Sequence, residues 1–228
     1  MKSNIFKEMV LGFKMLKYSM NIKMNGIMLL IMFIIGIMMD VISKGQNIMG
    51  TYMMLMSVVY IPQFFYGISV SSMVQSSNCK KKLLVNIPTI MIGIVSILMF
   101  AYICVTRYIF RLFEDASVPA NYSSIILFSF VLLLLILYAT VVFRKPIIGY
   151  IILMIFLLIY VPTVISKGTE WIWNLALRIS FTSDYLTCVL IGGGFLVFDI
   201  IMLYVFSKAL YKIPFSMKMW KRVLEQAK

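Results

Sequence analysis

Histidine is absent from this 228-residue chain, and charged residues make up only 13% of it. Its cysteines (Cys79, Cys104 and Cys188) are far apart and show none of the short spacings typical of zinc sites or redox motifs. Neither a metal site nor a Cys–His nucleophile can be assembled from these residues. The P-loop, GxGxxG, HExxH and GxSxG motifs are also missing. An enzyme that hydrolyses a nucleotide or transfers an acyl group is therefore excluded.

Apolar residues, in contrast, make up 62% of the chain, and its mean hydropathy is +1.00. They form long continuous runs rather than alternating with period two, and in hydrocarbon only helices or closed barrels pair every backbone group. We therefore predict an all-α integral membrane protein with six transmembrane helices. The predicted parts are an N-terminal amphipathic helix at 1–24, the helical domain at 25–210 and a basic cytoplasmic tail at 211–228.

The six expected spans each approach or exceed the ~20 residues that cross a bilayer. They are Asn25–Ile42, Ile48–Val74, Ile87–Thr106, Ser123–Phe143, Ile147–Ile165 and Tyr185–Ser207. The first is short, and its helix is expected to recruit Ile22. Pro88 and Pro146 are expected in the first turn of their helices, where a missing N–H is no loss.

Basic residues set the predicted orientation, because cytoplasmic loops carry an excess of Lys and Arg. With both termini inside, 16 of the 21 basic residues lie on the inner side. The other five are Lys44, Arg107, Arg111, Lys167 and Arg178, and the acidic residues Asp40, Glu114, Asp115, Glu170 and Asp184 join them outside. The net charge of +13 thus reflects a multi-pass protein of the cell membrane and indicates no nucleic-acid partner. The inner face should bind anionic membrane lipids.

Two further segments are expected to lie in the membrane interface. Within residues 1–24, Ile5, Phe6, Met9, Val10, Phe13, Leu16 and Met20 share one arc of a helix. The alternative is a basic tail that only enforces topology. On the outer side, Thr169–Phe181 carries two tryptophans beside charged groups and is too short and polar to span, which favours a short interfacial or re-entrant helix.

The inner segment Gln75–Asn86 is the strongest candidate for contact with a partner. Ser76, Ser77 and Asn78 are residues that start helices, and Lys80, Lys81 and Lys82 follow them. Leu83, Leu84 and Val85 then have the character of side chains that fill a partner's groove. The alternative interpretation is that the three lysines only obey the positive-inside rule.

Asp199 is the only acidic residue that the expected spans place deep in the membrane. A carboxylate there costs at least ~2.5 kcal/mol on insertion scales and should face the protein interior. We expect a structural role, a hydrogen bond to a neighbouring helix; the alternative is a group on a substrate path or a proton relay. The adjacent Gly192, Gly193 and Gly194 are expected to let another helix approach closely.

The layout of these segments resembles the permease subunits of ABC-2-type (type V) ABC exporters. The shared features are the N-terminal helix, six spans, the inner segment Gln75–Asn86, a tight inner turn at Arg144, Lys145 and Pro146, and the outer segment Thr169–Phe181. Within this family, the serine-rich run into SSNCKKKL looks like permeases of Gram-positive exporters of phenol-soluble modulins or of lantibiotic-immunity systems.

The resemblance implies a non-catalytic permease that pairs with a second copy or a sister chain and carries cytoplasmic ABC ATPase subunits. ATP and Mg would be held by the ATPases, and no cofactor by this chain. It also implies export of a hydrophobic or amphipathic cargo, a peptide among the candidates, with Gln63, Tyr66 and Ser69 in the cleft. One alternative is a substrate-binding or regulatory membrane subunit of a vitamin-type importer, which needs a compact polar outer pocket. The other is an intramembrane enzyme, for which no catalytic set can be named.

Overall fold

The computed structural model describes residues 10, 11, 14, 22–43, 50–56, 80–113, 122–142, 144–165 and 185–213. Over these ranges the chain forms helices joined by turns, with no strand, which confirms the predicted all-α class. The expected N-terminal amphipathic helix, the outer segment Thr169–Phe181 and the basic tail fall almost entirely outside the described residues.

The helices follow the apolar runs of the sequence. They are α2 (Ile22–Ile42), the π-helical turn η1 (Lys82–Asn86), α5 (Ile87–Phe113), α6 (Ser123–Val141), α7 (Pro146–Ile165) and α9 (Tyr185–Leu210), and residues 50–56 are also helical. As expected, α2 starts at Ile22 and α7 at Pro146. The main difference is that α5 continues past Thr106 to Phe113, so Arg107 lies inside a helix.

Two of the described helical stretches, Lys82–Phe110 and Tyr185–Leu210, are long and apolar enough to cross a membrane by length and composition. Shorter apolar stretches cover Gly26–Ile42, Phe128–Tyr138 and Ile147–Leu158. By this measure the described part of the chain contains two helices that could associate with a membrane.

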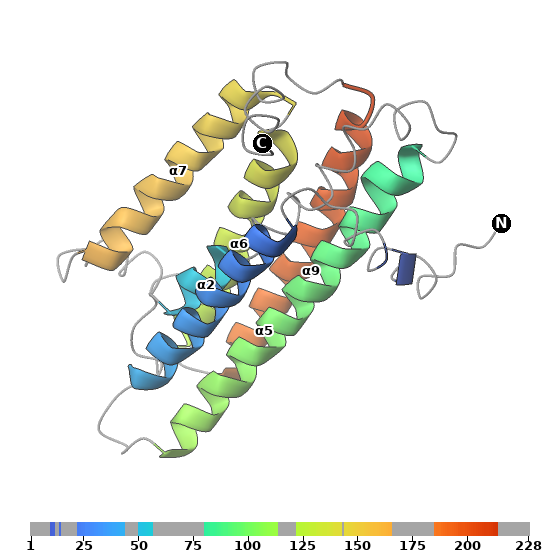
Figure 1. Cartoon of the computed structure of the whole chain (residues 1–228). Coiled ribbons are helices and arrows are strands. Elements are labelled where there is room, and N and C mark those ends of the chain that lie inside the picture. Colours follow the sequence, from blue (N-terminus) through green and yellow to red (C-terminus); the bar gives the residue numbers. More distant parts are fainter. Residues whose placement is uncertain are drawn as a thin grey trace.

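The central helices form a bundle in which α9 packs along both α6 and α5, and α7 packs on α6 (Figure 1). The hydroxyl of Tyr185 donates to the Cys104 carbonyl at 2.9 Å, whereas a Cβ at Gly93 would lie 3.8 Å from Ile200. α5 and α9 are therefore antiparallel. α6 runs in the same direction as α9, since the Tyr122 and Tyr185 rings meet at one end and Ser129 donates to the Gly192 carbonyl further along.

These directions define two ends of the bundle. The Arg107 end holds the last turns of α2 and α5 and the first turns of α6 and α9. The Lys80 end holds η1, the last turns of α6 and α9 and the turn into α7. At that turn the backbone is tight, because a Cβ at Gly149 would lie 2.6 Å from the Cα of Val142.

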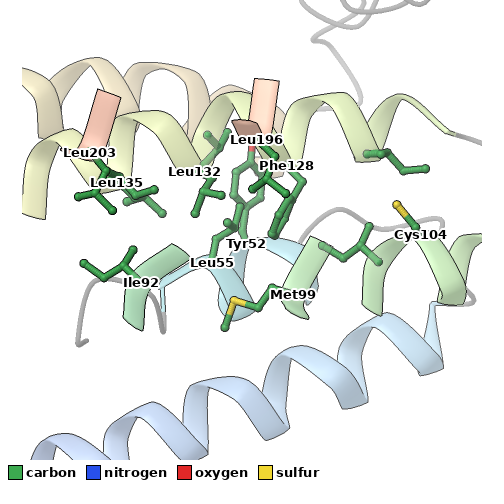
Figure 2. Packing of buried hydrophobic residues seen from close by; sticks show 14 of the residues in the cluster. Tyr52, Leu55, Ile92, Met99, Cys104, Phe128, Leu132, Leu135, Leu196 and Leu203 are labelled. Carbon is green, nitrogen blue, oxygen red and sulfur yellow. The ribbon is translucent and has the colours of Figure 1, made fainter. Parts of the chain in front are cut away.

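The apolar core lies between α5, α6 and α9, and residues 50–56 insert into it. Figure 2 shows Tyr52 and Leu55 among side chains from α5 and α6, with Phe128 and Leu196 beside Tyr52. Tyr52 also meets Phe156 of α7 edge to face, with 6.5 Å between ring centroids. Residues 50–56 thus link α7 to the central helices.

Pro88 lies in the first turn of α5, as expected, but helical backbone also precedes it. The helix begins at Lys80, and the wide turn η1 precedes Pro88, with the Ile87 N–H bonded to the Lys82 carbonyl. Proline has no N–H and its ring clashes with a carbonyl one turn earlier. A π-helical turn at that point accommodates the ring without ending the helix.

Candidate functional site

A buried ion pair joins α5 to α2 at the Arg107 end. Arg107 Nη2 donates to Asp40 Oδ1 at 2.7 Å and to Thr51 Oγ1 at 3.1 Å, and the two charged side chains are 4% and 0% exposed. Three elements, α2, residues 50–56 and α5, therefore meet at one guanidinium. Removing one partner of such a buried pair typically costs ~3–5 kcal/mol, because it leaves an uncompensated charge.

Two glycines bring the acceptors Asp40 and Thr51 together. A Cβ at Gly50 would lie 2.7 Å from the Asp40 N and from the Gly36 carbonyl, and one at Gly36 would lie 2.9 Å from the Gly50 carbonyl. These distances are shorter than real Cβ contacts allow, so only glycine permits the approach. Because Thr51 follows Gly50 directly, the backbone contact aligns its hydroxyl with the Asp40 carboxylate.

Tyrosines hold the other side of the Arg107 end. The Tyr185 ring lies 5.4 Å from that of Tyr122 and 5.6 Å from that of Tyr108, measured between centroids. Together with the bond from Tyr185 to the Cys104 carbonyl, these contacts tie the first turns of α6 and α9 to the last turns of α5. The Arg107 end is therefore closed by polar and aromatic contacts on both sides of α5.

The sequence places Asp199 deep in a span and Asp40 with the outer charges, yet Asp40 is as fully buried in the bundle as Asp199, at 0% exposure. The sequence places Asp40 among the outer charges because it stands near the end of its apolar run, and Arg107 because it follows one. The missed signal is that each stands on the buried face of its helix. Asp40 follows Gly36 by one turn, and Arg107 follows the buried Ile103 by one turn.

Asp199 itself lies on the buried face of α9 and is 0% exposed, so it faces the protein interior as predicted. Neither of its carboxyl oxygens has a hydrogen-bond partner among the described residues. The expected bond to a neighbouring helix is therefore not made in this arrangement. The associated glycines behave differently from one another: a Cβ at Gly192 would lie 3.1 Å from Ile125 and from Phe100, whereas Gly193 and Gly194 face open space.

The described part of the predicted partner-binding segment begins at Lys80. Lys81 is exposed, and Lys80, Lys82 and Leu83 are half-buried. Leu84, at 7% exposure, and Val85, at 0%, are buried within the chain, where η1 packs against α5 and α9. The continuous helix turns both side chains toward the bundle, and their contact with a partner's groove stays a prediction.

Only some of the other predicted site residues belong to the described part of the chain. Arg144 is buried at 7% exposure and Lys145 is exposed, both in the turn between α6 and α7. Ser76, Ser77, Asn78, Gln63, Tyr66 and Ser69 lie outside the described residues.

The chemistry that these residues offer is electrostatic. Among the described residues no group of three His, Cys, Asp or Glu side chains could hold a metal ion, and the side chains of Cys104 and Cys188 are buried. What the bundle does contain is an ion pair and an isolated carboxyl in an apolar interior, where charge interactions are strong and unpaired charge is costly. Comparison of the chain with protein-family models, with curated proteins and with solved structures finds no match.

Proposed function

We propose that this chain is the transmembrane permease subunit of an ATP-driven ABC exporter that moves a hydrophobic or amphipathic cargo, such as a peptide, out of the cell. The observation that carries the proposal is a helical bundle with charged residues inside and apolar residues outside. Asp40 and Arg107 are buried, and charged groups within membrane helices are costly enough that they commonly mark transport pathways or moving parts.

The outer surfaces of the helices support a lipid environment. Large apolar side chains are most exposed at Ile42 of α2 (78%), Ile147 of α7 (76%) and Leu190 of α9 (75%), and each has further exposed apolar neighbours on its helix. Extended apolar surface of this kind is rare on soluble monomers. A bilayer would cover this surface, and we propose six spans with both termini in the cytoplasm, the orientation that the basic residues predict.

The exporter class rests on the resemblance in layout and on the lack of a nucleotide motif anywhere in the sequence. A permease that cannot hydrolyse ATP needs separate ABC ATPase subunits, which bind the ATP and Mg, and a second copy of itself or a sister permease. In the proposed orientation the Lys80 end faces the cytoplasm, and we propose that Lys80 and Lys81 contact an acidic surface of the ATPase. Lys145 lies in the second cytoplasmic turn.

The test is purification of the tagged chain from its native membranes in mild detergent, followed by mass spectrometry and an ATP hydrolysis assay. We expect an ABC ATPase to co-purify. The double variant Lys80→Gln/Lys81→Gln should reduce its recovery several-fold, because the contact loses two positive charges. The matched control is Lys208→Gln/Lys212→Gln, which removes two exposed lysines at the same end of the bundle and should retain the ATPase.

If no nucleotide-hydrolysing protein accompanies the wild-type chain, the exporter proposal fails. A small high-affinity ligand retained on the outer side would instead favour the binding subunit of a vitamin-type importer. Equal loss of the ATPase from both lysine pairs would show that inner charge in general, and not the segment at Lys80, makes the contact.

A further inference from the structure

The contacts at the Arg107 end divide the bundle into two parts. α2 and residues 50–56 form one part, because their backbones are in direct contact at Gly36 and Gly50, with no room for a side chain between them. α5, α6 and α9 form the other, joined by the Tyr185–Cys104 bond, the Ser129–Gly192 bond and the contact of Gly192 with Phe100. We call the boundary between these two parts the seam.

Arg107 bridges the seam with a specific polar contact. Its Nη2 belongs to α5, and two groups that accept from it, Asp40 Oδ1 and Thr51 Oγ1, belong to the first part. The apolar contacts across the seam, such as those of Leu55 with the core, lack the directional preference of a hydrogen bond. A buried ion pair, in contrast, is either made with good geometry or broken at high cost, so it favours two discrete arrangements over a continuum.

The helix that carries Arg107 also reaches the other end of the bundle. Residues 80–113 are helical without interruption, which at ~1.5 Å per residue is about 50 Å from Lys80 to the end of α5. A displacement of the Lys80 end can therefore reach Arg107 along one helix. The helix is easiest to bend at the π-helical turn Lys82–Asn86.

We propose that the contact of Arg107 with Asp40 and Thr51 is a latch that holds the extracellular end of the bundle closed, and that movement of α5 releases it. The assignment of this end to the extracellular side rests on the proposed function. In the latched state α5 is held against α2 and residues 50–56. In the released state Arg107 leaves both acceptors, the seam separates, and water reaches the face of α5 that carries Ile103 and Arg107.

The test measures how fast a cysteine in the seam reacts with a membrane-impermeant maleimide added outside intact cells. The reporter is Ile103→Cys, one turn before Arg107 and 0% exposed in the closed bundle, in a chain with Cys79→Ser, Cys104→Ala and Cys188→Ala. Asp40→Asn keeps the side-chain shape but removes the charge, so the latch should open more often. We expect labelling to accelerate roughly tenfold or more, the factor that corresponds to loss of a charge-assisted hydrogen bond.

The matched control is Asp199→Asn, the same change at a second carboxyl that is also 0% exposed but has no contact with Arg107. This variant should label at the reference rate. The swapped pair Asp40→Arg/Arg107→Asp keeps opposite charges at the two positions and should restore slow labelling. If Asp40→Asn fails to insert into the membrane, the swapped pair is used for the test instead.

The latch is overturned if Asp40→Asn labels at the reference rate, if Asp199→Asn accelerates labelling equally, or if an inserted swapped pair labels fast. The measurement needs no ATPase. Failure of the ATPase to co-purify would therefore refute the exporter and leave the latch standing, whereas unchanged labelling beside a co-purifying ATPase would refute the latch alone.

Discussion

The close backbone contact between α2 and residues 50–56 makes a sharp prediction for Gly50→Ala. The new methyl would lie 2.7 Å from the backbone N of Asp40 and 2.7 Å from the carbonyl of Gly36. Neither atom is the end of a flexible side chain, so α2 and residues 50–56 must move apart by several tenths of an ångström. Overpacking of this kind typically costs ~1–3 kcal/mol, and it also draws Asp40 away from Arg107.

The matched control is Gly193→Ala in α9. A Cβ at Gly193 meets nothing within 4 Å, so the methyl adds no clash. Alanine in a helix interior is more favourable than glycine by ~0.5–1 kcal/mol. The same substitution is therefore expected to destabilise the chain at Gly50 and to stabilise it at Gly193.

The assay is the apparent Tm in one detergent, from the fraction of protein that stays monodisperse on size-exclusion chromatography after fixed heating. For a chain of this size 1 kcal/mol corresponds to roughly 2–4 °C. We expect Gly50→Ala to lower Tm by ~2–12 °C and Gly193→Ala to raise it by ~1–4 °C. If both variants shift Tm in the same direction by similar amounts, the close approach of the two backbones is not present.

Two further predictions concern the buried carboxyl of α9 and the topology. Asp199→Asn should assemble and transport nearly normally if the role of Asp199 is structural, whereas abolished transport in well-assembled protein would assign it to the transport path. Asp199→Leu removes a buried carboxyl that has no hydrogen-bond partner among the described residues, so it is expected to stabilise the bundle by ~1–3 kcal/mol. In a cysteine-free background, Lys44→Cys should react with an impermeant maleimide from outside, and Lys81→Cys and Lys145→Cys should not; outside labelling at position 81 would reverse the orientation.

The helix positions could be predicted from the sequence because they depend on the chain itself. Long apolar runs form helices wherever water is scarce, and the predicted starts at Ile87, Ser123 and Tyr185 agree with α5, α6 and α9. The helix continues past Thr106, where the predicted span ends, to Phe113. Arg107 continues the helix since a partner neutralises it.

The candidate site could be predicted only in part. The inward direction of Asp199 followed from the cost of a charge facing lipid. The inward direction of Leu84 could not be predicted in this way, because the sequence favours a short helix at Gln75–Asn86 that is separate from the next span. In the structure the helix from Lys80 continues through η1 into α5, so Leu84 shares a face with Ile87 and Met91, both buried.

By itself the sequence determined the helical class, the apolar exterior and the distribution of charge along the chain, since these depend on composition and on spacing within single segments. Only the tertiary structure decided which charges meet. Asp40 and Arg107 are 67 positions apart, and their contact requires the backbones at Gly36 and Gly50 to touch. The order of the helices along the sequence does not predict that contact. Contacts between helices depend on which helix faces pack together, and these faces are determined by the packing of all the helices at once.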